Sequence, residues 1–77
     1  MSEKNLLSDF LRWQGIDLGE TVEIRVWSKI IRGKLKDIDD FRNILVIETE
    51  NPKNPIVLIP FKRIHYISLY HNGVEHK

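Results

Sequence analysis

The sequence lacks cysteine altogether and contains only three prolines and four glycines. Without cysteine the chain has no disulfide scaffold, no thiol nucleophile, no iron–sulfur cluster and no thiolate zinc site. The low proline and glycine content also excludes a low-complexity chain. A globular domain that folds without covalent cross-links is therefore expected.

Long apolar runs are missing too, since no window approaches the roughly 20 apolar residues that a membrane span requires. The first residues, Met1 to Lys4, lack the apolar core of a signal peptide. We therefore expect a cytoplasmic protein with no membrane partner.

The chain also has no large excess of charge of one sign. It contains 12 Lys and Arg residues and 11 Asp and Glu residues, which gives a formal net charge of +1. A protein that binds nucleic acid through phosphate charge alone is usually far more basic. If nucleic acid is the ligand, base contacts or repeated sites must supply much of the affinity. With 77 residues the chain buries only about 60% of its unfolded surface, so self-association is expected.

The N-terminal segment is predicted to be a helix over about residues 5–15. Its apolar residues recur at helical spacing, and either Ser2 or Asn5 is suited to cap its start. Gly15 suits the left-handed residue that ends a helix, and Ile16 beyond it can contact the last turn. The apolar stripe consists of Leu6, Leu7, Phe10 and Leu11.

Residues from about 20 to 70 are predicted to form five short strands. Apolar residues alternate from Thr21 to Val26 and again after a turn at residues 28–29, where Gly33 indicates a sharp bend. A polar turn is expected at 37–42, and the third strand, 44–47, should be covered on both sides. The fourth, 56–59, should end at Pro60, and the fifth covers 64–69.

These elements predict a mainly β fold, in which an N-terminal α-helix precedes a five-stranded, strongly bent antiparallel small barrel. The whole chain, 1–77, is expected to be a single domain with a turn at 71–73 and a short C-terminal tail over 71–77.

The segment from Gly33 to Val46 carries the most specific pattern. It reads Gly, x, apolar, x, x, apolar, Asp, x, aromatic, x, Asn and then apolar residues, and it resembles the first sequence motif of the Sm and Sm-like family. The fixed positions are occupied by Gly33, Leu35, Ile38, Asp39, Phe41, Asn43 and Ile44.

The second motif of that family is only partly present. Residues 57–59 match its apolar start and 64–68 match its end, but Pro60 and Phe61 stand where the family usually has Arg-Gly. The Lys-His pair of the bacterial Hfq branch is absent as well. The chain thus resembles a divergent Sm-like protein over roughly residues 5–69.

The resemblance implies a ring of several subunits, assembled by pairing of edge strands, that binds single-stranded and often U-rich RNA. It implies that Phe41 stacks on a base, that Asn43 bonds the base edge and that Asp39 holds their loop. With the usual Arg missing, we expect Phe61 to supply a second stacking face. Phosphate charge would then come from Lys62 and Arg63.

Two other functions fit the same sequence. One is an oligomeric Sm-like scaffold that has lost RNA binding through Pro60 and Phe61, and the other is a monomeric SH3-like barrel that binds DNA or protein. Phe41 could also be a core residue and Asn43 a turn former. Trp27 points away from the apolar face of its strand, so either the helix or a neighbouring subunit should cover it.

No catalytic or metal site is predicted. The acidic run from Asp37 to Asp40 lacks the glycine and distal glutamate of a calcium loop. The histidines, His65, His71 and His76, lack the spacing of zinc ligands. Because the serines have no nucleophile context and no phosphate-binding loop exists, neither an enzyme nor a cofactor is expected.

Overall fold

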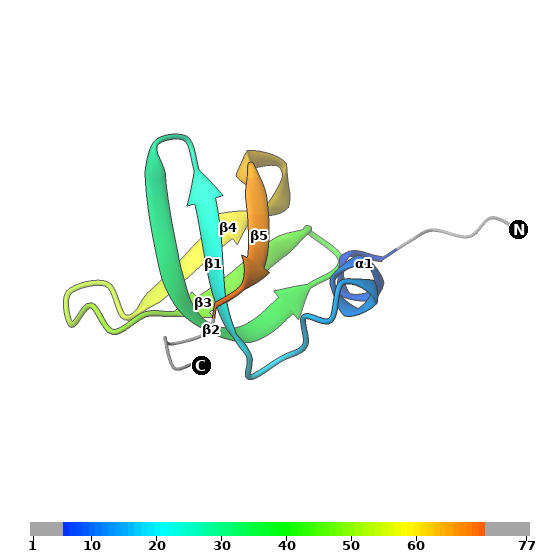
Figure 1. Cartoon of the computed structure of the whole chain (residues 1–77), viewed down its shortest axis with the longest axis horizontal. Helices are drawn as coiled ribbons and strands as arrows, with labels where there is room; N and C mark the ends of the chain where they lie inside the picture. The colour runs from blue at the N-terminus through cyan, green and yellow to red at the C-terminus, as the bar shows by residue number, and fades with distance from the viewer. Residues whose placement is uncertain (1–5, 71–77) are drawn as a thin grey trace, which may run out of the picture.

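The computed structural model describes residues 6–70 and confirms the predicted mainly β fold. The antiparallel sheet has the strand order β4-β3-β2-β1-β5 (Figure 1). The predicted caps Ser2 and Asn5, and the turn and tail over 71–77, lie outside the described residues. In chain order the elements are α1 (Leu7–Trp13), β1 (Thr21–Val26), β2 (Lys29–Asp39), β3 (Ile44–Glu48), β4 (Ile56–Pro60), the 3₁₀ helix η1 (Phe61–Arg63) and β5 (Tyr66–Leu69).

The predicted end of α1 is confirmed. Gly15 has φ +82°, and its N–H donates to the carbonyl of Arg12 at 2.9 Å. The N–H of Ile16 donates to the carbonyl of Leu11, also at 2.9 Å. This pair of bonds is the Schellman motif, in which a left-handed glycine satisfies the last carbonyls and the next residue returns to the core.

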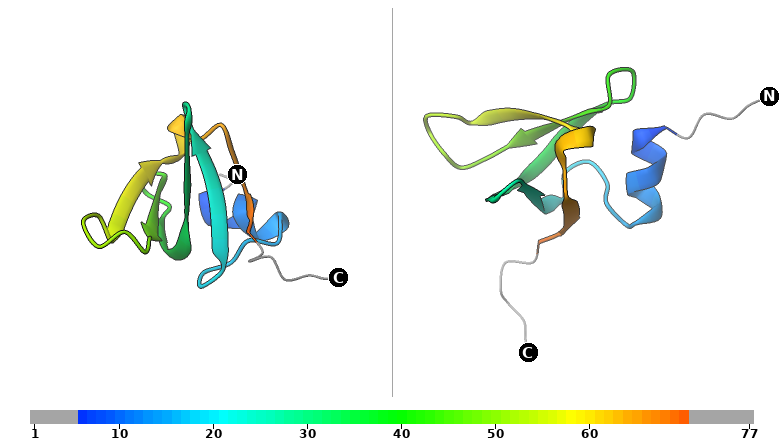
Figure 2. Two further views of the ribbon diagram at one scale, coloured as in Figure 1. Left: turned by 60° about the vertical axis from the view of Figure 1, so that its left-hand side comes forward. Right: turned by 90° about the horizontal axis from the view of Figure 1, so that it is seen from above.

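The bend in β2 changes the partner of that strand. Its first half, up to Lys34, pairs with β1, and its second half, from Lys34 to Asp39, pairs with β3. The views in Figure 2 show the sheet curving at this bend, with α1 on one side. Gly33 lies there because a Cβ atom would come within 2.5 Å of the Glu48 carbonyl oxygen. Only glycine allows the two backbones to approach this closely.

Gly33→Ala is therefore expected to destabilise the domain by about 1–3 kcal/mol, as overpacking does in a rigid core. The added methyl would also meet Cγ2 of Ile47 at 2.6 Å, so β3 must shift. Denaturant unfolding measures the change, and Lys34→Ala on the exposed face of β2 is the control, expected within about 0.5 kcal/mol of wild type. Equal midpoints for the two variants would contradict the close approach.

The core lies between the curved sheet and α1. The helix contributes two buried residues and the loop that follows contributes Ile16, while the strands contribute alternate residues from their inner face. Figure 1 shows α1 beside the end of β2, so the helix covers one side of the bent sheet. The buried set is Leu7, Leu11, Ile16, Val22, Ile24, Leu35, Leu45, Ile47 and Ile59.

Two boundaries and the burial of one strand differ from the sequence-based expectations. The polar turn predicted over 37–42 is wrong at its start: β2 continues to Asp39, because a register shift between Leu35 and Asp37 lets the acidic segment pair with β3. The third strand is not covered on both sides, since Ile44 and Val46 are only half-buried. Strand β5 begins at Tyr66, two residues later than predicted.

Strands β4 and β5 are the two edges of the sheet, and in the described part of the chain they do not pair with each other. Pro60 belongs to β4 as its last residue, with φ −64°. The N–H of Phe61 donates to Asn43 at 2.8 Å, and that of Thr49 donates to Pro55 at 2.8 Å. In an antiparallel pair, every second residue exchanges backbone hydrogen bonds with the facing strand. Phe61 is such a bonded position, so its neighbour Pro60 points its nitrogen away from β3 toward the open edge. The missing N–H of Pro60 therefore removes no hydrogen bond between β4 and β3.

A polar network on the outer face joins β1, β2 and β5. The Glu23 carboxylate accepts a 2.6 Å hydrogen bond from the Tyr66 hydroxyl and a 2.9 Å bond from Nε of Arg32. The Tyr66 bond and then the Arg32 bond lower the pKa of Glu23 below its ordinary value of 4.5. The same carboxylate raises the pKa of Tyr66 and that of Arg32.

This network predicts an acid-sensitive edge strand. Because folding lowers the pKa of Glu23, the stabilisation is present above pH 4.5, the ordinary value, and is lost as pH falls through the folded value. The melting temperature of wild type should therefore fall by more between neutral and acidic pH than the melting temperature of Glu23→Gln does. Glu50→Gln, at another exposed carboxylate, is the control. An equal acid-induced loss in wild type and Glu23→Gln would contradict the role of this carboxylate.

Over residues 6–70, no helix has the length and apolar character needed to cross a membrane.

Candidate nucleic-acid interface

The turn between β2 and β3 is organised by Asp39. Its Oδ1 atom accepts hydrogen bonds from the backbone N–H groups of Phe41 and Arg42, both at 3.0 Å. An aspartate that bonds the backbone two and three residues later fixes a tight turn without help from the rest of the fold. The carboxylate thus holds the loop, as its motif position predicts.

Asn43 closes the same turn and links it to the second motif. It has φ +57°, a left-handed conformation that asparagine tolerates better than most residues. Its carbonyl accepts the 2.8 Å hydrogen bond from the N–H of Phe61. Two segments that are almost 20 residues apart in sequence are therefore held together at this point.

Phe41 lies at the tip of the turn and is 91% exposed. The alternative in which this side chain belongs to the core is therefore wrong. A phenylalanine ring in water is unfavourable unless a partner covers it, and its backbone is fixed on both sides by Asp39 and Asn43. The ring is available to stack on a planar ligand.

A pocket of about 320 Å³ lies between the β2–β3 turn and η1, and Phe41 precedes its first lining residue in sequence but does not itself line it. Within the described residues its lining contains two cations and no carboxylate. Arg42 was not singled out from the sequence, where it counted only as part of a polar turn. The one signal for Arg42 in the sequence was its position directly before the motif asparagine. The pocket is lined by Arg42, Asn43, Pro60, Phe61 and Lys62.

Phe61 lines this pocket, but its ring is also in contact with α1. It is half-buried against the core and makes an edge-to-face contact with Phe10, with ring centroids 5.6 Å apart. Its backbone lies in η1 and needs no left-handed angle, since Trp27 and Asn43 are the only non-glycine residues with positive φ among residues 6–70. Replacement of glycine by Phe61 therefore causes no backbone strain and attaches η1 to α1.

Lys62 and Arg63 are exposed on η1. Lys62 borders the pocket beside Asn43, whereas Arg63 lies farther along, next to Trp27 and His65. The structure therefore brings Lys62 together with Asn43 and places Arg63 outside their pocket.

Asp40 has a role that the sequence did not reveal. Its Oδ1 accepts the N–H of Ser8 at 2.8 Å and its Oδ2 accepts the Ser8 hydroxyl at 2.7 Å. Leu6 precedes α1 and provides no side-chain cap, so Asp40 satisfies a free donor in the first turn of the helix. The contact spans 32 positions and joins α1 to the β2–β3 turn.

Within residues 6–70, no cluster of three or more His, Cys, Asp or Glu side chains could hold a metal ion. The oxygen of Asp39 that faces the turn is occupied by two N–H donors, and both oxygens of Asp40 bond Ser8.

Comparison with known proteins gives no family assignment. Neither a protein-family model, nor a curated protein, nor a solved structure matches the chain. The resemblance to the Sm-like family therefore depends on the motif residues and on their arrangement around the turn.

Proposed function

We propose that this chain is an Sm-like protein that assembles into a ring and binds single-stranded, U-rich RNA. It would act in RNA processing or ribonucleoprotein assembly. With no cysteine in the sequence, the reducing cytoplasm is the proposed compartment.

The observation that carries the proposal is the exposed Phe41 ring on a turn fixed by Asp39 and Asn43. A base stacked on an aromatic side chain gains about 1–3 kcal/mol. The Asn43 amide, with one acceptor and two donors, can match the carbonyl and N–H groups on the edge of uracil. A loop held by its own hydrogen bonds presents both groups with little loss of conformational entropy.

The charge around the pocket supports an anionic ligand. Arg42 and Lys62 line it without a carboxylate among the described residues, although the whole chain carries a net charge of only +1. Arg42 supplies a cation from the first motif where the second motif lacks its usual arginine. Local concentration of positive charge can neutralise RNA phosphates without making the protein basic overall.

The sheet edges support assembly. Strands β4 and β5 end the sheet on opposite sides, and exposed edges of this kind favour pairing with another chain. Pairing of β4 with β5 of the next copy is a head-to-tail contact, which gives a ring when the rotation closes. A ring repeats one weak base pocket and so raises affinity by multivalency.

Titration of the purified particle with oligo-U and oligo-A of equal length, at one fixed salt concentration, tests the proposal. We expect a preference for oligo-U that Asn43→Ala removes. Asn54→Ala, at an exposed asparagine in the β3–β4 loop, should bind as wild type does, and Asn43→Gly, which accepts the φ of +57° without strain, should lose the preference as Asn43→Ala does. Absence of binding to either RNA by a stable ring would favour the scaffold function, and a 9.1 kDa monomer would favour the SH3-like alternative.

A further inference from the structure

A second exposed aromatic residue lies beside Lys62, one of the two cations of the pocket at Asn43. Trp27 occupies the tip of the β1–β2 hairpin and is 68% exposed. Helix α1 does not cover it. Its described ring contact is with His65, edge to face, with centroids 5.8 Å apart. Most of the indole surface is therefore open to a planar ligand.

The backbone at Trp27 is strained. Val26 pairs with Lys29, so the hairpin loop has two residues, and only the first of them, Trp27, has positive φ, at +59°. This pattern matches a type II′ turn, in which the first central residue is normally glycine. A bulky side chain there is a conformational outlier, and such outliers gather at functional sites.

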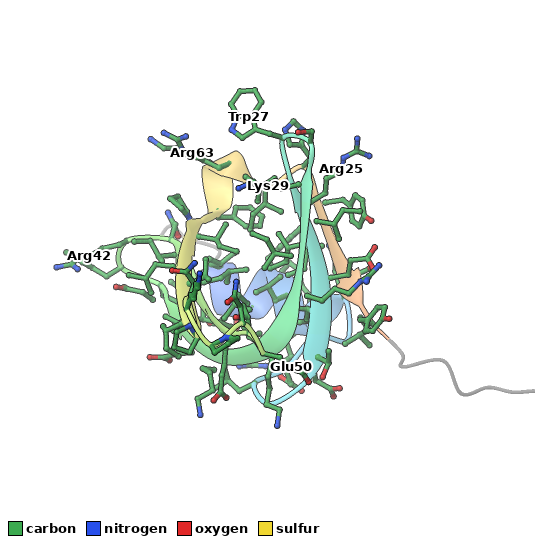
Figure 3. All side chains as sticks on the ribbon, turned by 90° about the vertical axis from the view of Figure 1, so that its left-hand side faces the viewer. Arg25, Trp27, Lys29, Arg42, Glu50 and Arg63 are labelled. Carbon is green, nitrogen blue, oxygen red and sulfur yellow. The ribbon has the colours of Figure 1, made fainter. Side chains whose placement is uncertain are left out.

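A hollow connects Trp27 to η1. It is lined by Trp27, Lys62, Arg63, Ile64 and His65, again with two cations and no carboxylate among the described residues. Lys62 lines both this hollow and the pocket beside Asn43, so it is the residue at which the two hollows adjoin on η1. Figure 3 shows Arg42, Arg63 and Trp27 following one another along the same side of the molecule.

We propose that each subunit binds a second nucleotide on Trp27, next to the base held by Phe41 and Asn43. The indole stacks on the second base, and Lys62 and Arg63 contact the phosphates between the two positions. The inference rests on the proposed RNA binding and extends it from one nucleotide to two nucleotides per subunit. Arg25 supports this geometry, because its Nε donates to the Trp27 carbonyl at 3.3 Å.

The two tryptophans of the chain allow a direct test. Trp13 lies on α1, is 72% exposed and borders neither hollow, so it is a matched control for Trp27. Trp13→Phe leaves Trp27 as the sole indole, and we expect oligo-U to quench its fluorescence. Trp27→Ala should weaken oligo-U binding by about tenfold, within the range of base–aromatic stacking, while Trp13→Ala should not change it.

A second variant separates binding from folding. Trp27→Gly fits the positive φ, so it should melt at or above the wild-type temperature and still lose RNA affinity by about tenfold. A merely structural tryptophan would instead lower the melting temperature and leave affinity unchanged.

The outcomes distinguish this inference from the function on which it depends. If wild type does not bind oligo-U, the RNA-binding function and the second position both fail. If wild type binds, Asn43→Ala weakens binding, but Trp27→Ala equals Trp13→Ala and no quenching occurs, only the second position fails. A change of particle mass in Trp27→Ala with unchanged RNA affinity would make Trp27 an inter-subunit contact and overturn the inference.

Discussion

Leu58→Pro is expected to convert the proposed ring into a folded monomer of 9.1 kDa. The residue lies in the middle of the edge strand β4 and its side chain is 61% exposed, so the core loses nothing. Hydrogen-bonded and non-bonded residues alternate along β4, and Leu58, like Pro60, is at a position that is not bonded to β3. Its N–H therefore points toward the open edge of the sheet. Proline removes this donor and places its ring where a neighbouring strand would pair.

Retention of the monomer fold is expected because β4 already contains a proline with the same orientation. Pro60 pairs with Ile44 at φ −64°, which shows that the strand accommodates a proline ring on its outer side. Circular dichroism and thermal melting of Leu58→Pro should therefore resemble those of wild type, and sedimentation at micromolar concentration should give the monomer mass.

Leu58→Ala is the control, because it truncates the same side chain and keeps the N–H. It should remain a ring if backbone pairing dominates the contact. A wild-type mass of 9.1 kDa would exclude both ring-forming functions. A Leu58→Pro particle as large as wild type would show that assembly uses another surface.

The fold was largely predictable because its determinants are local. A left-handed glycine at Gly15 and the alternation of apolar residues from Thr21 onward are encoded by neighbours in sequence. Gly33 indicated the bend of β2, although only the structure shows that the Glu48 carbonyl requires it. The extension of β2 through Asp37 was hidden, since an acidic run resembles a turn until its pairing with β3 is known.

Only the part of the candidate site that lies within a single turn was predictable. Asp39 and Asn43 act on their own turn and were identified from the resemblance of that segment to the first Sm motif. The N–H that Phe61 donates to Asn43 and the cap that Asp40 gives Ser8 join segments distant in sequence, so no local pattern indicates them. For the same reason the contact between the rings of Phe61 and Phe10 could not be predicted.

The second large effect is expected at Phe41, where alanine should abolish most of the RNA affinity without changing stability. The ring is 91% exposed, so its removal costs the core nothing. Loss of stacking is worth about 1–3 kcal/mol per base, and a value of about 1.4 kcal/mol within that range corresponds to tenfold weaker binding. An RNA that contacts two subunits of a ring loses this twice, so we expect about a hundredfold weaker binding of oligo-U.

Two comparisons assign this loss to stacking instead of to charge or apolar area. Phe41→Tyr keeps the aromatic face and should bind as wild type does, whereas Phe41→Leu keeps an apolar side chain and should bind as weakly as alanine. Phe41→Ala should leave the salt dependence of binding unchanged, because it removes no cation, while Lys62→Ala should reduce the slope by about 0.7 for each RNA phosphate that the protein no longer neutralises. Wild-type affinity in Phe41→Leu would mean that the exposed ring serves as an apolar contact, and base recognition would then have to come from Asn43 and the cations alone.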